Sequence, residues 1–284
     1  MLKHYLKFAF RNFKSNKIIF AGSLATLSLG ALCISLLFSY VHNELSMDDF
    51  HQEKEDIYVA TMKSSPKSEW RSPFNFKPQE YPEIENATSV INFLEDEVKL
   101  NHKEYTYTPK GIVADSSFFK VFNFKVTIGD KITLLKDYEA IILSEAYSKK
   151  MFGDANPIGQ KIKVEMRMHQ GTHIVKGIVK VSANSSLKFD YIIPNANKNY
   201  GRGGIHFISV KKDFSEDLFN KKIINSNNNV PKVYPQLTES ITKIVSFNEL
   251  YFSTEYKSVK KYSLLSSGNK KNIDILLVII FIIL

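Results

Sequence analysis

The sequence has almost no cysteine: the only one among 284 residues is Cys33, which lies inside a long apolar stretch. A disulfide within the chain is therefore excluded, and its polar part must be held together by packing alone. Several enzyme signatures are also missing, since there is no G-x-S-x-G, no C-x-x-C and no H-E-x-x-H. No paired carboxylates or nucleophile–base group stand out. The sequence therefore predicts a non-catalytic protein, with no catalytic residues, no cofactor-binding residues and no metal ligands.

Two segments approach a ligand-binding pattern without completing it. Residues 153–161 (GDANPIGQK) place five residues between the glycines, and Ile162 stands where a phosphate loop needs a hydroxyl for magnesium. Any energy source is therefore expected on another chain. The second segment contains three possible metal ligands, Glu165, His169 and His173, spaced i, i+4, i+8. This spacing would align them on a helix, but the segment is predicted to be a hairpin, where the alignment is lost.

Charge is also distributed unevenly. The formal net charge is +9, and the first 17 residues contain five basic residues and no acidic one. The remaining basic residues are spread out, so no nucleic-acid partner is expected. The mean hydropathy of −0.18 is typical of a soluble protein and conceals this segregation of polar and apolar segments.

Residues 18–41 form a run of 24 positions without a single charge. As a helix they would extend ~36 Å, which is enough to cross a hydrocarbon core of about 30 Å. A cleaved signal peptide is the competing interpretation, but its apolar region has only about 7–15 residues and ends in a small-x-small site. We therefore predict an uncleaved transmembrane helix. Because the basic flank precedes the run, the N-terminus is predicted in the cytoplasm and residues 42–272 outside it.

Residues 1–17 are predicted to form a cytoplasmic amphipathic helix. Its basic residues recur at helical spacing, while apolar residues occupy the other side: Leu2, Leu6, Ala9, Phe10 and Phe13. Such a helix would lie in the lipid headgroup layer, so membrane lipid is an expected partner. An ordinary basic flank of a membrane span remains the alternative.

The last residues are apolar as well. Residues 275–284 (ILLVIIFIIL) follow a polar run and would reach only ~15 Å as a helix, about half of the apolar slab. We predict the start of a second transmembrane helix over 273–284, truncated at the end of the sequence. A buried strand is the alternative, although the run lacks alternation.

The segment between the apolar ends predicts an α+β domain, because strands outnumber helices and several are linked by hairpins. A helix is predicted over residues 144–152, with Ser144 as N-cap and Gly153 as terminator. Gln170-Gly171 is predicted as the turn of a hairpin. Strands are predicted at residues 56–62, 84–92, 96–101, 105–108, 161–168, 173–179, 207–211 and 246–252.

A series of short motifs follows in the same segment. In chain order they are residues 114–124 (ADSSFFKVFNF), Gly129-Asp130, Leu134-Leu135, residues 141–145 (IILSE), 151–154 (MFGD), 156–160 (NPIGQ), 175–178 (VKGI) and 184–190 (NSSLKFD). Together with Tyr5-Leu6-Lys7, residues 9–12 (AFRN) and the segment after the apolar run, they resemble MacB/FtsX-type ABC transporter permeases with a MacB-like periplasmic core domain. Ser186 departs from the pattern, because a histidine is common at its position.

This resemblance implies a permease subunit, or its N-terminal fragment, in the bacterial inner membrane. A separate cytoplasmic ABC ATPase would hydrolyse ATP, and a second permease copy would complete the transporter. Motion would pass through residues 2–14, the first span and two linkers, residues 41–50 and 266–272. The extracytoplasmic domain would have two lobes, one of about 46–125 with 205–265 and one of about 126–204.

Two other function classes fit the same topology. One is the extracytoplasmic ligand-binding part of a two-span bacterial sensor, and the other is an exported enzyme on a membrane anchor. The sensor hypothesis lacks an output domain in this sequence, and the enzyme hypothesis lacks a catalytic constellation. A fragment ending inside its second span would be unable to transport alone, because half a helix leaves backbone carbonyls unpaired in hydrocarbon.

Overall fold

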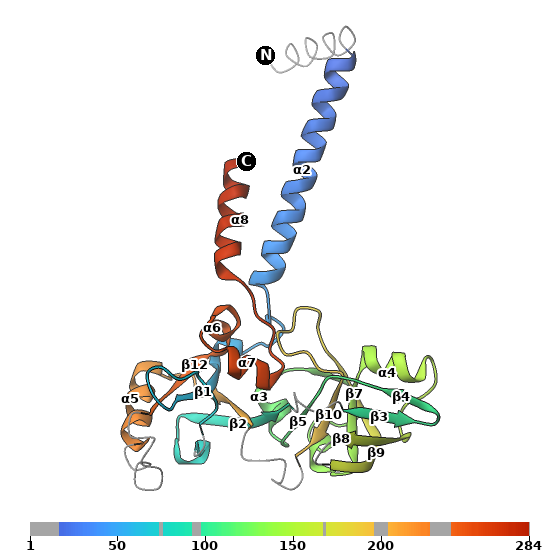
Figure 1. The fold of residues 1–284 in the computed structure, drawn as a ribbon, viewed down its shortest axis with the longest axis vertical. Coiled ribbons are helices and arrows are strands. Elements are labelled where there is room, and N and C mark those ends of the chain that lie inside the picture. Colours follow the sequence, from blue (N-terminus) through green and yellow to red (C-terminus); the bar gives the residue numbers. More distant parts are fainter. Residues whose placement is uncertain are drawn as a thin grey trace. The chain divides into compact units, whose positions relative to one another are not determined.

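The computed structural model describes residues 17–73, 76–92, 98–166, 169–195, 204–227 and 240–283. The predicted amphipathic helix over residues 1–17 lies outside this part of the chain except for Lys17. Two compact units are present, one made of Met1–Ser46 with Asn269–Leu284 and the other of Met47–Gly268 (Figure 1).

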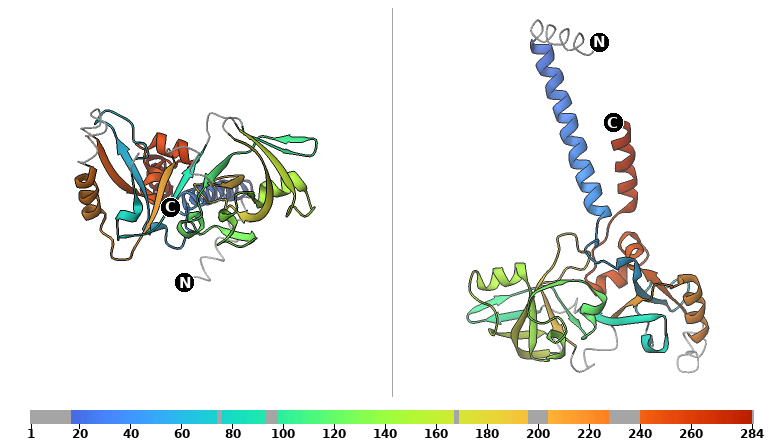
Figure 2. Two further views of the ribbon diagram at one scale, coloured as in Figure 1. Left: turned by 90° about the horizontal axis from the view of Figure 1, so that it is seen from below. Right: turned by 180° about the vertical axis from the view of Figure 1, so that it is seen from behind.

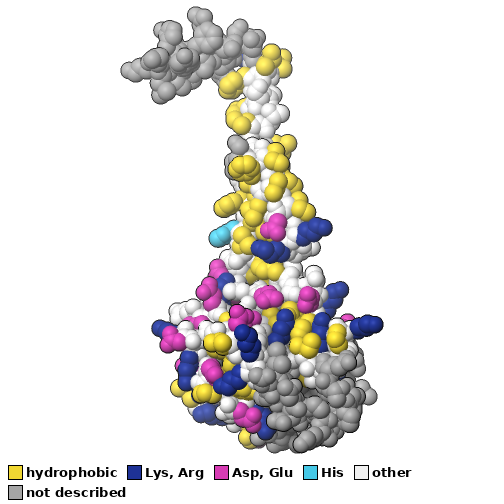
Figure 3. All heavy atoms as spheres, turned by 90° about the vertical axis from the view of Figure 1, so that its left-hand side faces the viewer, with side chains coloured by type: hydrophobic (Ala, Val, Ile, Leu, Met, Phe, Trp, Pro, Cys, Tyr) yellow, Lys and Arg dark blue, Asp and Glu magenta, His cyan; other side chains and the backbone are white. Residues whose placement is uncertain are grey.

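The first unit consists of two helices that contact each other, α2 (Lys17–Leu45) and α8 (Lys270–Ile283). Among the described residues, α2 is the one helix long and apolar enough to cross a membrane. Its large apolar side chains, such as Leu27 and Leu36, are exposed, and Figure 3 shows such side chains along this unit. The alternative of a strand at residues 275–284 is wrong, because residues 275–283 lie in α8.

The second unit is built on a sheet of 12 strands in the described residues. The strand order is β12-β1-β11-β2-β5-β10-β7-β9-β8-β3-β4, and β6 pairs with β9. The strands are β1 (Ile57–Lys63), β2 (Ile84–Ile91), β3 (Lys99–His102), β4 (Tyr105–Tyr107), β5 (Gly111–Ala114), β6 (Lys125–Ile128), β7 (Ala140–Ser144), β8 (Lys161–Met166), β9 (His169–Lys180), β10 (Tyr191–Pro194), β11 (Ile205–Val210) and β12 (Ile241–Ser246).

Helices pack around this sheet, as Figure 2 shows from two further sides. They are α3 (Phe118–Val121), α4 (Glu145–Phe152), α5 (Glu216–Asn227), α6 (Phe247–Phe252) and α7 (Lys257–Ser263), with short 3₁₀ turns η1 (Lys54–Asp56), η2 (Pro78–Glu80) and η3 (Leu134–Lys136). Two strand pairs, β5–β10 and β7–β9, are parallel, and the other pairs are antiparallel. The predicted α+β class is confirmed.

The boundary expected between the two lobes is wrong in one place. The β3–β4 hairpin falls in the first of the expected lobes by sequence, but β3 pairs with β8. This hairpin therefore belongs with β7, β8 and β9, whereas β1, β2, β11 and β12 lie in the other half of the sheet. Strand pairing between residues far apart in the sequence decides this, and local patterns do not encode it.

Local signals placed most elements but not all of them. Helix α4 is confirmed with both of its caps: the Ser144 hydroxyl accepts the Tyr147 N–H, and Gly153 has a φ of 60°. The strand predicted over residues 246–252 is wrong, because Ser246 ends β12 and its hydroxyl caps α6. The turn predicted at Gln170-Gly171 is also misplaced, since both residues pair with β8 inside β9.

Aromatic side chains fill the largest core. The side chains of Phe118, Phe119, Phe122 and Phe124 are all at most 3% exposed. The Phe122 ring packs against rings from three other elements, among them Phe207 on β11 and Phe247 on α6. Burying each such ring stabilises the fold by roughly 1.5–3 kcal/mol. This core fixes the position of the chain segments that precede β1 and follow α7.

Candidate functional site

Three segments that are distant in sequence meet in the second unit. They are residues 47–54, which follow α2, the loop 182–187, and residues 264–268, which precede α8. Six residues hold them together, and we call this group the linker clamp: Asp48, Asn184, Ser186, Leu187, Leu265 and Ser266.

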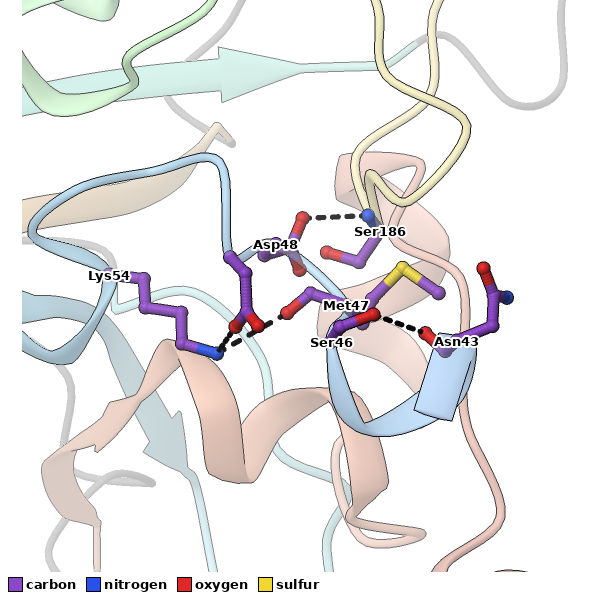
Figure 4. A network of polar contacts seen from close by, with 7 residues as sticks. Asn43, Ser46, Met47, Asp48, Lys54 and Ser186 are labelled. Carbon is purple, nitrogen blue, oxygen red and sulfur yellow. Dashed lines mark hydrogen bonds and ion pairs between the residues drawn. The ribbon is translucent and has the colours of Figure 1, made fainter. Parts of the chain in front are cut away.

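Asp48 anchors the first segment to the loop (Figure 4). Its carboxylate Oδ1 accepts the Ser186 N–H at 2.8 Å, and its own N–H donates to the Asn184 carbonyl at 2.7 Å. Its φ of 63° is in the left-handed region, where Asp and Asn are the most tolerated residues after glycine. The turn after α2 therefore needs this residue type for both its backbone and its side chain.

Ser186 also holds the last segment. Its carbonyl accepts the Ser266 N–H at 2.8 Å and the Ser266 hydroxyl at 3.2 Å. Beside it, Leu187 and Leu265 form an antiparallel bridge. One peptide segment thus binds both linkers, through its N–H on one side and its carbonyl on the other.

Burial controls the electrostatics of Asp48, which is 2% exposed. Removal from water raises the pKa of the carboxyl from 3.8 to about 6, although the hydrogen bonds to Ser186 and the charge of Lys54 oppose the rise. Lys54 is held beside the clamp by an ion pair with Asp49 and by the Met47 carbonyl at 3.5 Å (Figure 4). The clamp therefore contains a carboxylate that is costly to keep charged.

His51 fastens the same segment to the aromatic core. Its Nδ1 accepts the Asn123 N–H at 3.0 Å, so the proton of the neutral ring is assigned to Nε2. Its ring packs against Phe50, Phe122 and Phe124. Burial, with a smaller effect of Lys131, lowers the pKa of His51 to about 3. The imidazole is thus a neutral packing and hydrogen-bonding group.

Lys260 secures the segment before α8. Its side chain is buried, and its ammonium donates to the carbonyls of Tyr251 and Ser253, at 2.9 and 2.6 Å, and to the Ser267 hydroxyl at 3.1 Å. Three oxygens thereby satisfy all three donors of the ammonium group. Burial lowers the pKa of Lys260 from 10.5 to about 8.

The residues considered earlier as possible metal ligands are not brought together. His173 is opposite Ile162 across the β8–β9 pair and is buried, whereas Glu165 is opposite Gln170. Since side chains alternate along a strand, Glu165 and His173 point to opposite faces. Within the described residues no group of three His, Cys, Asp or Glu could hold a metal. The glycines at 153 and 159 have positive φ and shape turns before β8.

The resemblance predicted two linkers, residues 41–50 and 266–272, but no pattern in the sequence pointed to the residues that anchor them. Asp48 belongs to none of the motifs, and Ser186 stands out only as a departure from one. A buried carboxylate beside a turn has no periodic signal. The one hint in the sequence is that Asp48 directly precedes a second acidic residue, Asp49.

The sequence matches the family model of the MacB-like periplasmic core domain over residues 20–226. No match was found among curated protein sequences.

Solved structures with similar folds share little sequence with the chain. A domain ascribed to a permease from Porphyromonas gingivalis superposes with a TM-score of 0.58 at 16% identity, covering 74% of this chain and 98% of that domain. The periplasmic region of MacB from Actinobacillus actinomycetemcomitans has a TM-score of 0.49 at 14% identity, covering 69% and 90%. The extracellular domain of the ABC-type transporter YknZ from Gram-positive bacteria has a TM-score of 0.49 at 14% identity, covering 66% and 99%.

Proposed function

Because this chain belongs to the family defined by the MacB-like periplasmic core domain, we propose that it is the permease subunit of an ABC transporter, or the N-terminal part of one. In this proposal residues 1–17 lie on the cytoplasmic face, 18–41 cross the bacterial inner membrane, 42–272 form the extracytoplasmic domain and 273–284 begin a second span. A partner ATPase and a second permease copy complete the transporter. The family match supports this function over the sensor hypothesis.

The linker clamp is the observation that carries the mechanism. Ser186 binds residues at both ends of the extracytoplasmic domain, Asp48 after the first span and Ser266 before the second. A displacement of either linker is therefore transmitted to the same loop, 182–187. We propose that ATP-driven movement of the spans reaches the domain through this loop, with no covalent chemistry on this chain.

Labelling tests the topology. In a Cys33→Ser background, Lys120→Cys places a thiol on an exposed position of α3. A membrane-impermeant maleimide should modify it in intact spheroplasts, and a thiol introduced within residues 1–17 should react only after lysis. The reverse pattern would contradict the proposed orientation.

Coupling is tested with a matched pair at Ser266. Ser266→Pro removes the N–H that donates to Ser186, whereas Ser266→Ala keeps it and removes only the hydroxyl contact. In the complex purified from native membranes, Pro should abolish the effect of ATP on hydrogen exchange in residues 182–187, and Ala should preserve most of it. The proposal would be overturned if ATP changed hydrogen exchange equally in both variants. It would also be overturned if the complex purified with the wild-type chain contained no ATPase.

A further inference from the structure

A cavity of about 400 Å³ lies against the loop that holds the linker clamp. Its lining comes from Lys110, residues 144–146 at the start of α4, and two stretches of chain, 180–183 and 188–190. These two stretches are the legs of the loop whose tip, residues 184–187, binds both linkers. The cavity and the clamp are therefore two sides of one loop.

Backbone hydrogen bonds make one wall of the cavity rigid. The Asp190 N–H donates to the Lys110 carbonyl at 2.7 Å, and the Lys110 N–H donates to Asp190 Oδ2 at 2.9 Å. The Asp190 carbonyl in turn accepts the Ser144 N–H at 2.8 Å. A wall fixed in this way loses little conformational entropy when a ligand binds.

The lining combines positive charge with apolar surface. Lys110, Lys180 and Lys188 come from three different stretches, and none of them forms an ion pair with another described residue. Two carboxylates are present, but that of Asp190 is engaged by the Lys110 N–H, and that of Glu145 is exposed. The rest of the lining consists of two serines and four apolar residues. Of the apolar residues, Ala146 and Ala183 are exposed and Val181 is half-buried, whereas Phe189 is buried in the aromatic core.

We propose that this cavity binds a small anion that has an apolar part, with its carboxylate or phosphate among the three lysines and its apolar part on Ala146, Val181 and Ala183. Lysine provides strong donors for either anionic group, and the apolar wall provides additional binding energy. Occupancy joins the two legs of the loop and so stabilises its tip. This effect on the clamp rests on the proposed function, whereas binding itself does not.

Binding is tested on the full chain in an uncharged detergent by isothermal titration, with inorganic phosphate, n-butyl phosphate and butyrate as probes. One butyl compound should bind more tightly than inorganic phosphate, and the tighter of the two identifies the anionic group. Lys180→Gln and Lys188→Gln should each weaken binding about threefold, and Glu145→Gln should strengthen it by a similar factor. Lys120→Gln, on α3 outside the cavity, is the matched control and should change nothing.

Three results would overturn the site. They are the absence of binding for all probes up to about 10 mM, affinities for both butyl compounds that do not exceed the affinity for inorganic phosphate, and affinities that the lysine variants leave unchanged. Binding should also weaken in high salt, because the lysines are accessible to screening ions.

Hydrogen exchange separates this proposal from the transport mechanism. In the wild-type chain, the tighter-binding probe should slow exchange of the Ser186 and Ser266 amides, and Lys188→Gln should reduce this slowing at the same subsaturating probe concentration. Binding without slower exchange would refute the link to the clamp. If slowing occurs but ATP never affects the loop, the proposed transport mechanism fails and the anion site stands.

Discussion

Asp48 combines three properties that rarely occur in one residue: a left-handed backbone, almost complete burial and a charge-assisted hydrogen bond to Ser186. The hydrogen bond stabilises the ionised form, but burial has the larger effect and raises the pKa of the carboxyl to about 6. The folded chain thus binds a proton at pH values where the unfolded chain has released it.

Asp48→Asn should remove a specific pH dependence of stability. The pKa of Asp48 is about 6 in the folded chain, and its ordinary value is 3.8. The stability that proton binding at Asp48 contributes is therefore fully present below pH 3.8 and is lost as pH rises through 6. Asn does not titrate, so the variant does not lose this stability as pH rises. Its side chain keeps an oxygen that accepts the Ser186 N–H, and it tolerates the left-handed backbone. The free energy of unfolding of the variant minus that of the wild type should increase by about 2–3 kcal/mol between pH 4 and 7.

Denaturant unfolding at the two pH values measures this difference. Asp49→Asn is the control, because Asp49 is the neighbouring carboxylate but is exposed. If this free-energy difference increases equally for Asp49→Asn, or does not increase for Asp48→Asn, burial does not raise the pKa of Asp48 as described.

Lys260→Met should be strongly destabilising, unlike Lys261→Met one residue later. Lys260→Met removes the ammonium that donates to the oxygens of Tyr251, Ser253 and Ser267. The loss of this donor should lower the free energy of unfolding by about 2–3 kcal/mol. Lys261 is exposed, so its substitution should change stability little. Equal losses for both would contradict the assigned contacts.

The pH dependence of the same pair gives an independent check. Since burial depresses the folded pKa of Lys260 to about 8, the unfolded chain binds more protons between about pH 8 and 10.5, and wild-type stability gains from rising pH there. The destabilisation by Lys260→Met should therefore be larger at pH 9.5 than at pH 7.5.

At the scale of elements, caps decide where strands give way to helices. Ser144 and Ser246 occupy equivalent positions: each ends a strand, and each hydroxyl accepts the N–H three residues later, at 3.2 and 3.1 Å. The first was recognised from the sequence and the second was not. Residues 247–252 are rich in aromatic residues, which favour strands, and the single cap outweighs that preference.

Ser246→Ala should therefore destabilise the domain by about 1 kcal/mol, because the Glu249 N–H loses its acceptor. Ser246→Asp should restore most of this loss, since a carboxylate also accepts the N–H and is favoured at a helix N-terminus. Thermal unfolding of the three chains gives the comparison. If Asp is as destabilising as Ala, the cap is not what begins α6.

At the scale of the molecule, the sheet joins three hydrophobic cores within the described residues, two of them large. Trp70, the only tryptophan, lies in the aromatic core with Phe122, and Ile162 lies in the core between β8 and α4. Backbone pairing continues from one half to the other through the parallel strands β5 and β10. We expect the two halves to unfold as one cooperative unit.

Ile162→Ala tests this cooperativity. Truncating the buried Ile162 side chain should lower the free energy of unfolding by about 2–5 kcal/mol. If the halves unfold together, the Trp70 fluorescence midpoint in denaturant should fall accordingly, although Trp70 belongs to the other core. An unchanged Trp70 midpoint would mean that the lobes unfold independently. Ile241→Ala, at a 40% exposed position, is the control and should have a small effect.

The sequence alone determined the apolar helix and the α+β class. These follow from local features, namely an uncharged run, periodicity and capping residues, which any chain segment carries by itself. The uncharged run of residues 18–41, for example, leaves few alternatives to a long apolar helix.

Only the tertiary structure decided which residues join the linkers. Asp48 and Ser186 are 138 positions apart, and their contact depends on the order and register of strands between them. The β3–β4 hairpin was assigned to the wrong lobe for the same reason. Hydrogen bonds between backbone groups are available to every residue type, so the sequence does not show which of them pair until the sheet brings them together.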